Sequence, residues 1–130
     1  MCIRDRNNID FFAYSPLSFG ILCIDPDREE NKEKSLIRNA LFENYKKPTY
    51  ELRRCLKRIA NKRSVSQAQV AINWCCYQGT IPLVGMRKKS QVIDISNVFK
   101  WNLNKDEFKE LKEVSKNCLK KMPKNPFSSI

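Results

Sequence analysis

Histidine is absent from this sequence of 130 residues. Six cysteines are present, but no two of them form a Cys-x-x-Cys pair, so the usual zinc-binding spacings cannot be drawn. The opening residues, MCIRDRNNIDFF, lack the continuous apolar segment of a secretory signal. No apolar run approaches the roughly 20 residues that a membrane-spanning helix needs. These absences predict no metal site and no membrane segment, and they favour reduced thiols in the cytoplasm.

Acidic residues are few relative to basic ones. The chain has 14 Asp and Glu against 25 Lys and Arg, which gives a formal net charge of +11. Such an excess suits nucleic acid, an acidic membrane surface or a phosphorylated ligand, and it also occurs in lysine-rich surfaces without a partner. The hydrophobic fraction of 42% is enough for a folded core. The length is that of one ordinary domain.

The hydrophobic pattern predicts two strands separated by helices. Residues 9–15, IDFFAYS, and residues 81–85, IPLVG, are short apolar runs typical of buried strands. Helices are expected over residues 32–45, after Pro48 and Thr49, between Ser66 and Gly79, after Ser90, and after Asn104. Because strands that alternate with helices favour parallel βα units, we expect a parallel sheet.

Start signals and apolar stripes define these helices more closely. Ser66 and Gln69 have the spacing of a capping box, and Asn104 is followed by acids at 106 and 107. Ser90 is the expected cap of the short helix that follows it. The expected buried faces are Val70, Ala71, Trp74 and Cys75; then Val92, Ile95 and Phe99; and finally Phe108, Leu111, Val114 and Cys118.

Two strands do not make a stable sheet of their own, so the chain is expected to be part of a larger fold. Residues 1–6 read unlike the rest and are set aside as a junction or an artefact. Residues 7–118 form the expected domain portion. Residues 119–130 are polar and interrupted by prolines, and they are expected to form an extended tail.

The stretch QGTIPLVGMRKKSQ, residues 78–91, combines features of an anion site. An apolar strand runs into Gly85, and Arg87 with two lysines follows, with no acid in the stretch. Glycine allows a ligand to approach the backbone closely, and an arginine fork matches a phosphate. The start of the next helix would present backbone N–H groups to the same place.

Three segments of the chain resemble the aldo-keto reductases. FFAYSPLSFGIL resembles the seventh strand and following loop of that family, with its pattern A-Y-S-P-L-x-x-G-x-L. SVSQAQVAINWCCYQGTIPLVGMRKKSQV resembles the helix and eighth strand, and FKWNLNKDEFKEL resembles the entry to the following helix. The order and spacing of the three segments strengthen the resemblance, which covers about residues 9–118.

The resemblance implies an α/β fold that is the C-terminal part of a (β/α)₈ TIM barrel. Barrels of this class need about 250 residues, so this chain would be an incomplete barrel. The activity implied for a complete protein is NADPH-dependent reduction of a small-molecule aldehyde or ketone by hydride transfer. The family's catalytic Asp, Tyr, Lys and His lie on earlier strands and match nothing here, so this chain alone is expected to be inactive.

The resemblance also assigns cofactor contacts. Tyr14 would stack on the nicotinamide, and the loop after it would line the pyrophosphate. The adenosine phosphate would lie beside the loop after the second strand. The residues expected to contact NADPH are Tyr14, Ser15, Pro16, Leu17, Gly85, Arg87, Lys88, Gln91 and Asp94. Where the family usually places an adenine-binding Asn, this chain has Ile95.

Two other functions remain open from the sequence. LRRCLKRIANKR, residues 52–63, crowds six basic residues on one helix and suits a small nucleic-acid-binding module, although no aromatic residues are interleaved. A barrel relative that binds a cofactor without catalysis would keep both loops and lose the catalytic residues. The residue-level alternatives are a solvated turn for Arg87–Lys89, an ordinary helix surface for Gln91, a strand-end aromatic for Tyr14 and the start of a turn for Ser15.

Overall fold

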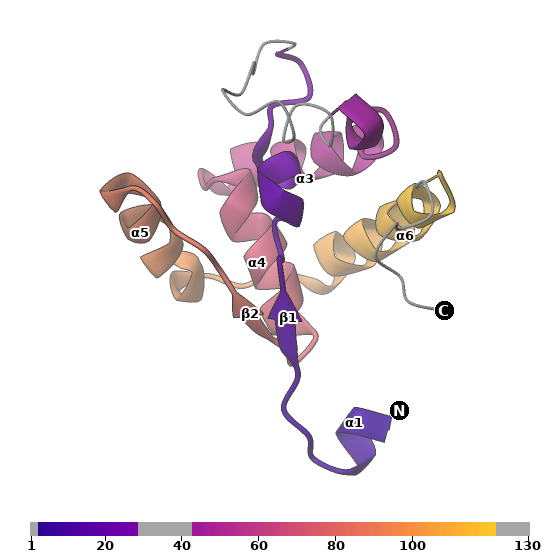
Figure 1. Cartoon of the computed structure of the whole chain (residues 1–130), viewed down its shortest axis with the longest axis vertical. Helices are drawn as coiled ribbons and strands as arrows, with labels where there is room; N and C mark the ends of the chain where they lie inside the picture. The colour runs from indigo at the N-terminus through magenta and orange to yellow at the C-terminus, as the bar shows by residue number, and fades with distance from the viewer. Residues whose placement is uncertain (1–2, 29–42, 122–130) are drawn as a thin grey trace.

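The computed structural model describes residues 3–28 and 43–121, and Figure 1 shows their arrangement. The elements in chain order are α1 (Ile3–Arg6), β1 (Phe12–Tyr14), η1 (Ser18–Cys23), α3 (Tyr50–Arg63), α4 (Gln67–Tyr77), β2 (Ile81–Leu83), α5 (Lys89–Ser96), η2 (Val98–Lys100) and α6 (Lys105–Lys121). Residues 32–42 of the first expected helix lie outside the described residues, and residues 43–46 are helical. No helix of the described part is long and apolar enough to cross a membrane.

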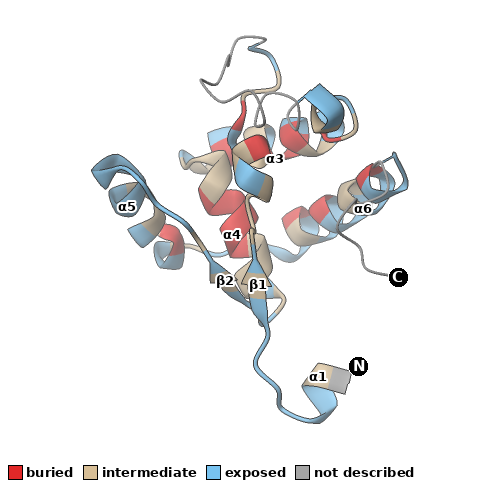
Figure 2. Cartoon of the chain, in the orientation of Figure 1, coloured by how far each residue is buried: buried red, intermediate tan, exposed pale blue. Residues whose placement is uncertain are grey.

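Strands β1 and β2 form a two-stranded parallel sheet, as the alternation of strands and helices predicts. The pairs are Phe12 with Ile81, Ala13 with Pro82 and Tyr14 with Leu83. The expectation that both strands are buried is wrong. Only the central pair is partly buried, and the other four side chains are exposed. Within the described residues each strand has one neighbour only, so its other edge is unpaired and its exposed side chains lie open (Figure 2).

The core lies between α3, α4 and α6 (Figure 2). Its centre contains Leu56 and Ile59 from α3, Val70 from α4 and Leu111 from α6. Within α3, Leu56 and Ile59 are three residues apart and lie on one face of the helix. The apolar faces of the three helices thus pack against one another. Of the residues expected on the buried faces of α4 and α6, Val70, Ala71, Leu111 and Cys118 are buried. The other four are only partly buried: Trp74, Cys75, Phe108 and Val114.

Helix α4 begins and ends as its sequence predicts. The Ser66 hydroxyl accepts a hydrogen bond from the Gln69 backbone N–H at 3.1 Å, which makes Ser66 the N-cap. Gly79 adopts a φ of +69° directly after the helix, a conformation that costs glycine little. Its N–H and that of Thr80 bond back to the last turn at Cys76 and Cys75. The chain thus reverses within three residues and enters β2.

Asn73, for which the sequence predicted no role, lies in the middle of α4 with only 4% of its surface exposed. Its amide nitrogen donates to the carbonyls of Val98 and Trp101, and its oxygen accepts the Leu103 N–H at 3.0 Å. One side chain thereby satisfies three backbone groups of the connection between α5 and α6. This connection has no regular ladder of its own, so Asn73 holds it against α4.

The short helix after β2 differs from expectation in two places. Its N-cap is Lys88, and Ser90 lies within the first turn. Phe99, expected in the buried face, is 80% exposed, whereas Val98 is buried. The reason is that α5 ends at Ser96 and η2 follows, so the helical period breaks before it reaches residue 99. Val92, also expected in the buried face, is 50% exposed, and Ile95 is only partly buried.

Helix α6 starts with the expected cap and ends later than expected. The Asn104 side chain accepts the Glu107 N–H at 2.8 Å, and the Glu107 carboxylate accepts the Asn104 N–H at 3.1 Å. This reciprocal pair is a capping box. Leu119 to Lys121, assigned to an extended tail from the sequence, continue the helix, because no residue before Pro123 interrupts it.

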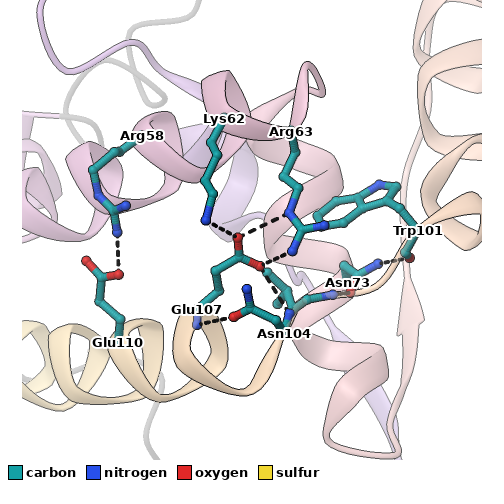
Figure 3. Close-up of polar contacts among 9 residues, drawn as sticks. Arg58, Lys62, Arg63, Asn73, Trp101, Asn104, Glu107 and Glu110 are labelled. Atoms are coloured by element: carbon teal, nitrogen blue, oxygen red, sulfur yellow. Dashed lines mark hydrogen bonds and ion pairs between the residues drawn. The ribbon is translucent and has the colours of Figure 1, made fainter.

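Glu107 also joins α6 to α3, as Figure 3 shows. Arg63 donates to both carboxylate oxygens, at 2.7 and 3.1 Å, and the Lys62 ammonium lies 3.5 Å away. The Arg63 guanidinium also lies 5.7 Å from the centre of the Trp101 ring. Burial opposes ionisation of Glu107, but the hydrogen bonds from Arg63 and Asn104 outweigh it and hold the pKa of this carboxyl below its usual range.

Replacing Asn73 by leucine should loosen the connection between α5 and α6. The substitution leaves two carbonyls and the Leu103 N–H without their partner, at a cost of about 1–3 kcal/mol. Hydrogen exchange of the Leu103 amide should accelerate by at least tenfold. Asn97→Leu is the matched control, since the side chain of the partly buried Asn97 donates to the Ile93 carbonyl within its own helix end and not to Leu103. Equal protection of Leu103 in both variants would contradict the assignment.

Glu107→Gln should destabilise the chain at neutral pH by about 1.5–3 kcal/mol, the range for hydrogen bonds to charged groups. A carboxyl whose pKa is lowered by folding stabilises the folded state above its unfolded pKa of about 4.3 and loses that contribution as the pH falls through the folded pKa. The difference in unfolding free energy between the native chain and the variant should therefore shrink below about pH 4. Urea unfolding followed by tryptophan fluorescence at several pH values measures it, and a constant difference would refute the prediction.

Candidate functional site

The loops after β1 and β2 leave the same edge of the sheet. Parallel pairing sets Tyr14 opposite Leu83 at the carboxyl ends of the strands. Residues 15–17 and 84–88 therefore start as neighbours, although they are about 70 positions apart in the chain. In parallel α/β folds, ligands bind at this carboxyl edge. The structure thus brings the two groups of expected cofactor residues to one side of the molecule.

The loop after β1 has a left-handed backbone at several residues. Ser15, Ser18 and Phe19 have φ angles between 48° and 58°, and Gly20 has a φ of 95°. Left-handed conformations are costly for residues with a Cβ, and they gather at functional sites more often than elsewhere. The Ser18 N–H closes a turn on the Ser15 carbonyl at 2.9 Å. This turn bends the chain away from the direction of β1.

The same loop is attached to the core at its far end. Leu17 packs against the helical core, and Ile21 is buried. The Gln67 amide donates to the carbonyl of Leu22 at 3.0 Å, which connects η1 to the first turn of α4. Tyr14, in contrast, is 80% exposed at the end of β1. Its ring is thus available to a planar ligand, as the resemblance implies.

The loop after β2 is organised by Gln91. Its side-chain oxygen accepts the N–H groups of Arg87 and Lys88, at 2.8 and 3.0 Å. These two bonds fix the backbone just before α5. The sequence predicted a cofactor contact for Gln91 but not this structural contact. The first N–H groups of a helix have no partner within it, and α5 begins at Lys89, beside these two residues. The result is a fixed loop that carries cations at a helix N-terminus.

The charges of this loop are available to a ligand. Arg87, Lys88 and Lys89 are exposed, and none of them forms an ion pair within residues 3–28 and 43–121. A Cβ built on Gly85 would meet nothing within 4 Å, so the approach to the backbone there is open. Cations, a helix N-terminus and open backbone suit a phosphate ester. These residues therefore fit the phosphate of a dinucleotide.

Asp94 is engaged differently from the other expected residues. Ser66 Oγ donates to one of its carboxylate oxygens at 2.6 Å, and Gln69 Nε2 donates to the other at 2.7 Å. The capping box expected for α4 is therefore only half formed, because the Gln69 side chain turns to Asp94 instead of to the Ser66 N–H. Gln69 also accepts the indole N–H of Trp101 at 3.0 Å.

A small apolar cavity of about 110 Å³ lies beneath the β1 loop. Pro16 and Leu22 line it from the loop, and Trp74, Cys75 and Leu111 line it from the helices. The buried Trp74 indole N–H has no hydrogen-bond partner within the described residues. Burial raises the pKa of the Cys75 thiol to about 11, so this wall offers no reactive thiolate. We find no constellation for nucleophilic catalysis there.

The cationic helix α3 is neutralised by acids of neighbouring elements. Arg58 pairs with Glu110, and Lys57 lies 2.7 Å from both Asp25 and Asp27. The other basic residues of the helix are buried or paired: Arg53 is 3% exposed and donates to the Lys46 carbonyl, while Arg54, Lys62 and Arg63 have acidic partners. This helix therefore differs from the loop after β2, whose cations form no ion pair in the described part of the chain.

A solved structure and a family profile both match this chain. Similarity to the glycerol dehydrogenase AKR11B4 from Gluconobacter oxydans extends over 98% of this chain and 40% of that one, with a TM-score of 0.68 and 26% sequence identity. The fold of this chain thus matches a part of the fold of that protein. Residues 1–116 match the profile of the aldo/keto reductase family, and the chain belongs to this family.

A curated relative agrees with that assignment. The chain is 33% identical over 127 residues to the chloroplastic pyridoxal reductase of Arabidopsis thaliana. The match includes 98% of this chain and 34% of the relative. The chain therefore spans about a third of the length of that relative.

Gln91→Leu should release the loop after β2, whereas Gln91→Glu should preserve it, because a carboxylate accepts the same two N–H groups. Amide exchange of Arg87 and Lys88 should accelerate by about tenfold in the leucine variant and stay near the native rate in the glutamate variant, as expected for losing about 1.4 kcal/mol of local protection. Exchange measured by NMR separates the variants. Unchanged exchange in Gln91→Leu would show that the bond does not organise the loop.

Proposed function

We propose that this chain forms the cofactor-binding end of an NADPH-dependent oxidoreductase that reduces small-molecule aldehydes or ketones. The single observation that carries the proposal is the meeting of two loops at one sheet edge, with exposed cations on the second. Membership of the aldo/keto reductase family supports the reaction type. The reductase and dehydrogenase names of the two relatives agree with carbonyl–alcohol chemistry.

In this proposal each loop has a distinct task. Arg87 and Lys88 hold the 2′-phosphate, with Gly85 leaving room for the adenosine. Ser15, Pro16 and Leu17 border the pyrophosphate, and the exposed ring of Tyr14 stacks on the nicotinamide. NADPH, when bound, supplies the hydride for the carbonyl carbon.

The groups that donate the proton to the carbonyl oxygen are proposed to lie outside this chain. The sequence has no histidine, and its tyrosines do not match the catalytic tyrosine of the family. A cofactor-binding relative without catalysis would have the same two loops, and assay of a protein that includes the remaining strands distinguishes it from a reductase. A cytoplasmic location remains a prediction.

The contacts of α3 argue against a nucleic-acid-binding module. Nucleic-acid binding of the expected kind uses basic side chains that are free to neutralise phosphates. Four of the six basic residues on this helix contact acids of other elements, and Arg53 is buried. Binding there would have to break ion pairs that join α3 to the rest of the chain.

Arg87→Ala should weaken NADPH binding by about tenfold or more, the loss expected for one charge-assisted phosphate contact. NADH binding should be unchanged, since NADH lacks the 2′-phosphate. Calorimetric titration of the 130-residue chain with NADPH, NADH and 2′,5′-ADP measures this. Arg54→Ala is the matched control, because Arg54 is an exposed arginine far along the sequence from both loops, and its contacts, 3.9 Å to Glu51 and 5.8 Å to the centre of the Tyr50 ring, stay within α3.

Two results would contradict the proposal. The first is a native chain that binds NADPH no better than NADH. The second is an Arg87→Ala variant that retains the native preference for NADPH.

A further inference from the structure

Helix α5, which follows the cationic loop, has little apolar attachment to the rest of the molecule. None of its residues is buried, and Val92 and Ile93 are about half exposed. Hydrophobic packing usually supplies most of the stability of a protein helix. Polar contacts therefore have an unusually large share in deciding where α5 lies, and with it Arg87 and Lys88.

The polar contact that reaches furthest into the core is that of Asp94. This residue lies one turn after Gln91, the side chain that organises the cationic loop. Both of its carboxylate oxygens accept short bonds from the start of α4, one from Ser66 Oγ and one from Gln69 Nε2. Bonds to a carboxylate are about twice as strong as those between neutral groups.

The amide of Gln69 is held in a single orientation. An indole N–H can only donate, so the bond from Trp101 requires the Gln69 oxygen on that side and the NH₂ group toward Asp94. Gln69 is 4% exposed, and a reversed amide would place two donors against each other in a buried site. Trp101 is in turn held by Asn73 and lies beside Arg63 (Figure 3). The chain of contacts thus leads from α5 to the interface of α3, α4 and α6.

We propose that Ser66 and Gln69 are positioning residues for the phosphate site, acting through Asp94, which is a tether of α5 and not a ligand of the cofactor. This proposal rests on the proposed function and deepens it. Ser66 is the decisive residue, because it is the N-cap of α4 and contacts α5 through Asp94 rather than the cationic loop itself. If Asp94 is a tether, a Ser66 variant that loses the bond to Asp94 should bind the cofactor more weakly. If Asp94 is a direct ligand, the same variant should bind as the native chain does.

The test uses Ser66→Asp, which separates the two tasks of the serine. An aspartate is a good N-cap and keeps the bond to the Gln69 N–H, but it cannot donate to Asp94 and repels its carboxylate. NADPH affinity of the 130-residue chain should fall by about tenfold. NADH affinity should stay within about twofold of native, because the loss concerns the 2′-phosphate. Ser66→Thr retains both the cap and the hydroxyl donor, and it should bind as the native chain does.

Hydrogen exchange gives a second readout that needs no cofactor. In Ser66→Asp the amides of α5 should exchange faster, while those of α4 keep their protection because its cap is intact. Native protection of α5 in this variant would overturn the proposal. So would Asp94→Ala weakening NADH and NADPH alike while Ser66→Asp leaves both unchanged, since that pattern identifies Asp94 as an adenine ligand.

The two proposals fail separately. A native chain without preference for NADPH refutes the proposed function, and the exchange of α5 then still decides whether the tether exists. A native preference for NADPH that Ser66→Asp leaves intact refutes the tether alone.

Discussion

The parallel register of β1 and β2 is the constraint on which the arrangement of this chain depends. Parallel strands require a crossover between them, and here α3 and α4 lie in that crossover and form the core with α6. The register also sets Tyr14 opposite Leu83, so the loops that follow both strands leave one edge. An antiparallel pair would have sent these loops to opposite ends. The candidate site therefore exists because of the same pairing that allows the helices to pack.

Two strands contribute little stability, so side-chain hydrogen bonds hold the segments that the sheet cannot. Asn73 fixes the connection before α6, Gln67 fixes η1, and Asp94 fixes α5. All three bonds end on α4, in which the consecutive residues 69–73 are buried. Unsatisfied polar groups are costly in such surroundings, which makes these contacts specific. The outer side chains of both strands, Phe12, Tyr14, Ile81 and Leu83, stay exposed.

Local signals in the sequence were sufficient for the elements and insufficient for their side-chain contacts. The cap at Ser66, the turn at Gly79 and the start of α6 depend on residues within four positions of each other, and the structure confirms them. Gln69 shows the limit of this reasoning. Its spacing from Ser66 predicts a capping box, but an aspartate 25 residues later competes for the same amide. Phe99 is a second example of this limit. The helical period that would bury its side chain ends at Ser96.

The same limit applies to charge. The sequence offers two basic clusters, and composition cannot tell which of them is available to an anion. In the folded chain Glu107 and Glu110 of α6, with Asp25 and Asp27 near η1, meet the cations of α3. The cluster after β2 has no acid of the described chain at ion-pair distance, since Asp94, three residues after Gln91, accepts instead from Ser66 and Gln69. Both oxygens of this carboxylate are engaged at the start of α4, so within the described residues no acid competes with a phosphate for Arg87 and Lys88.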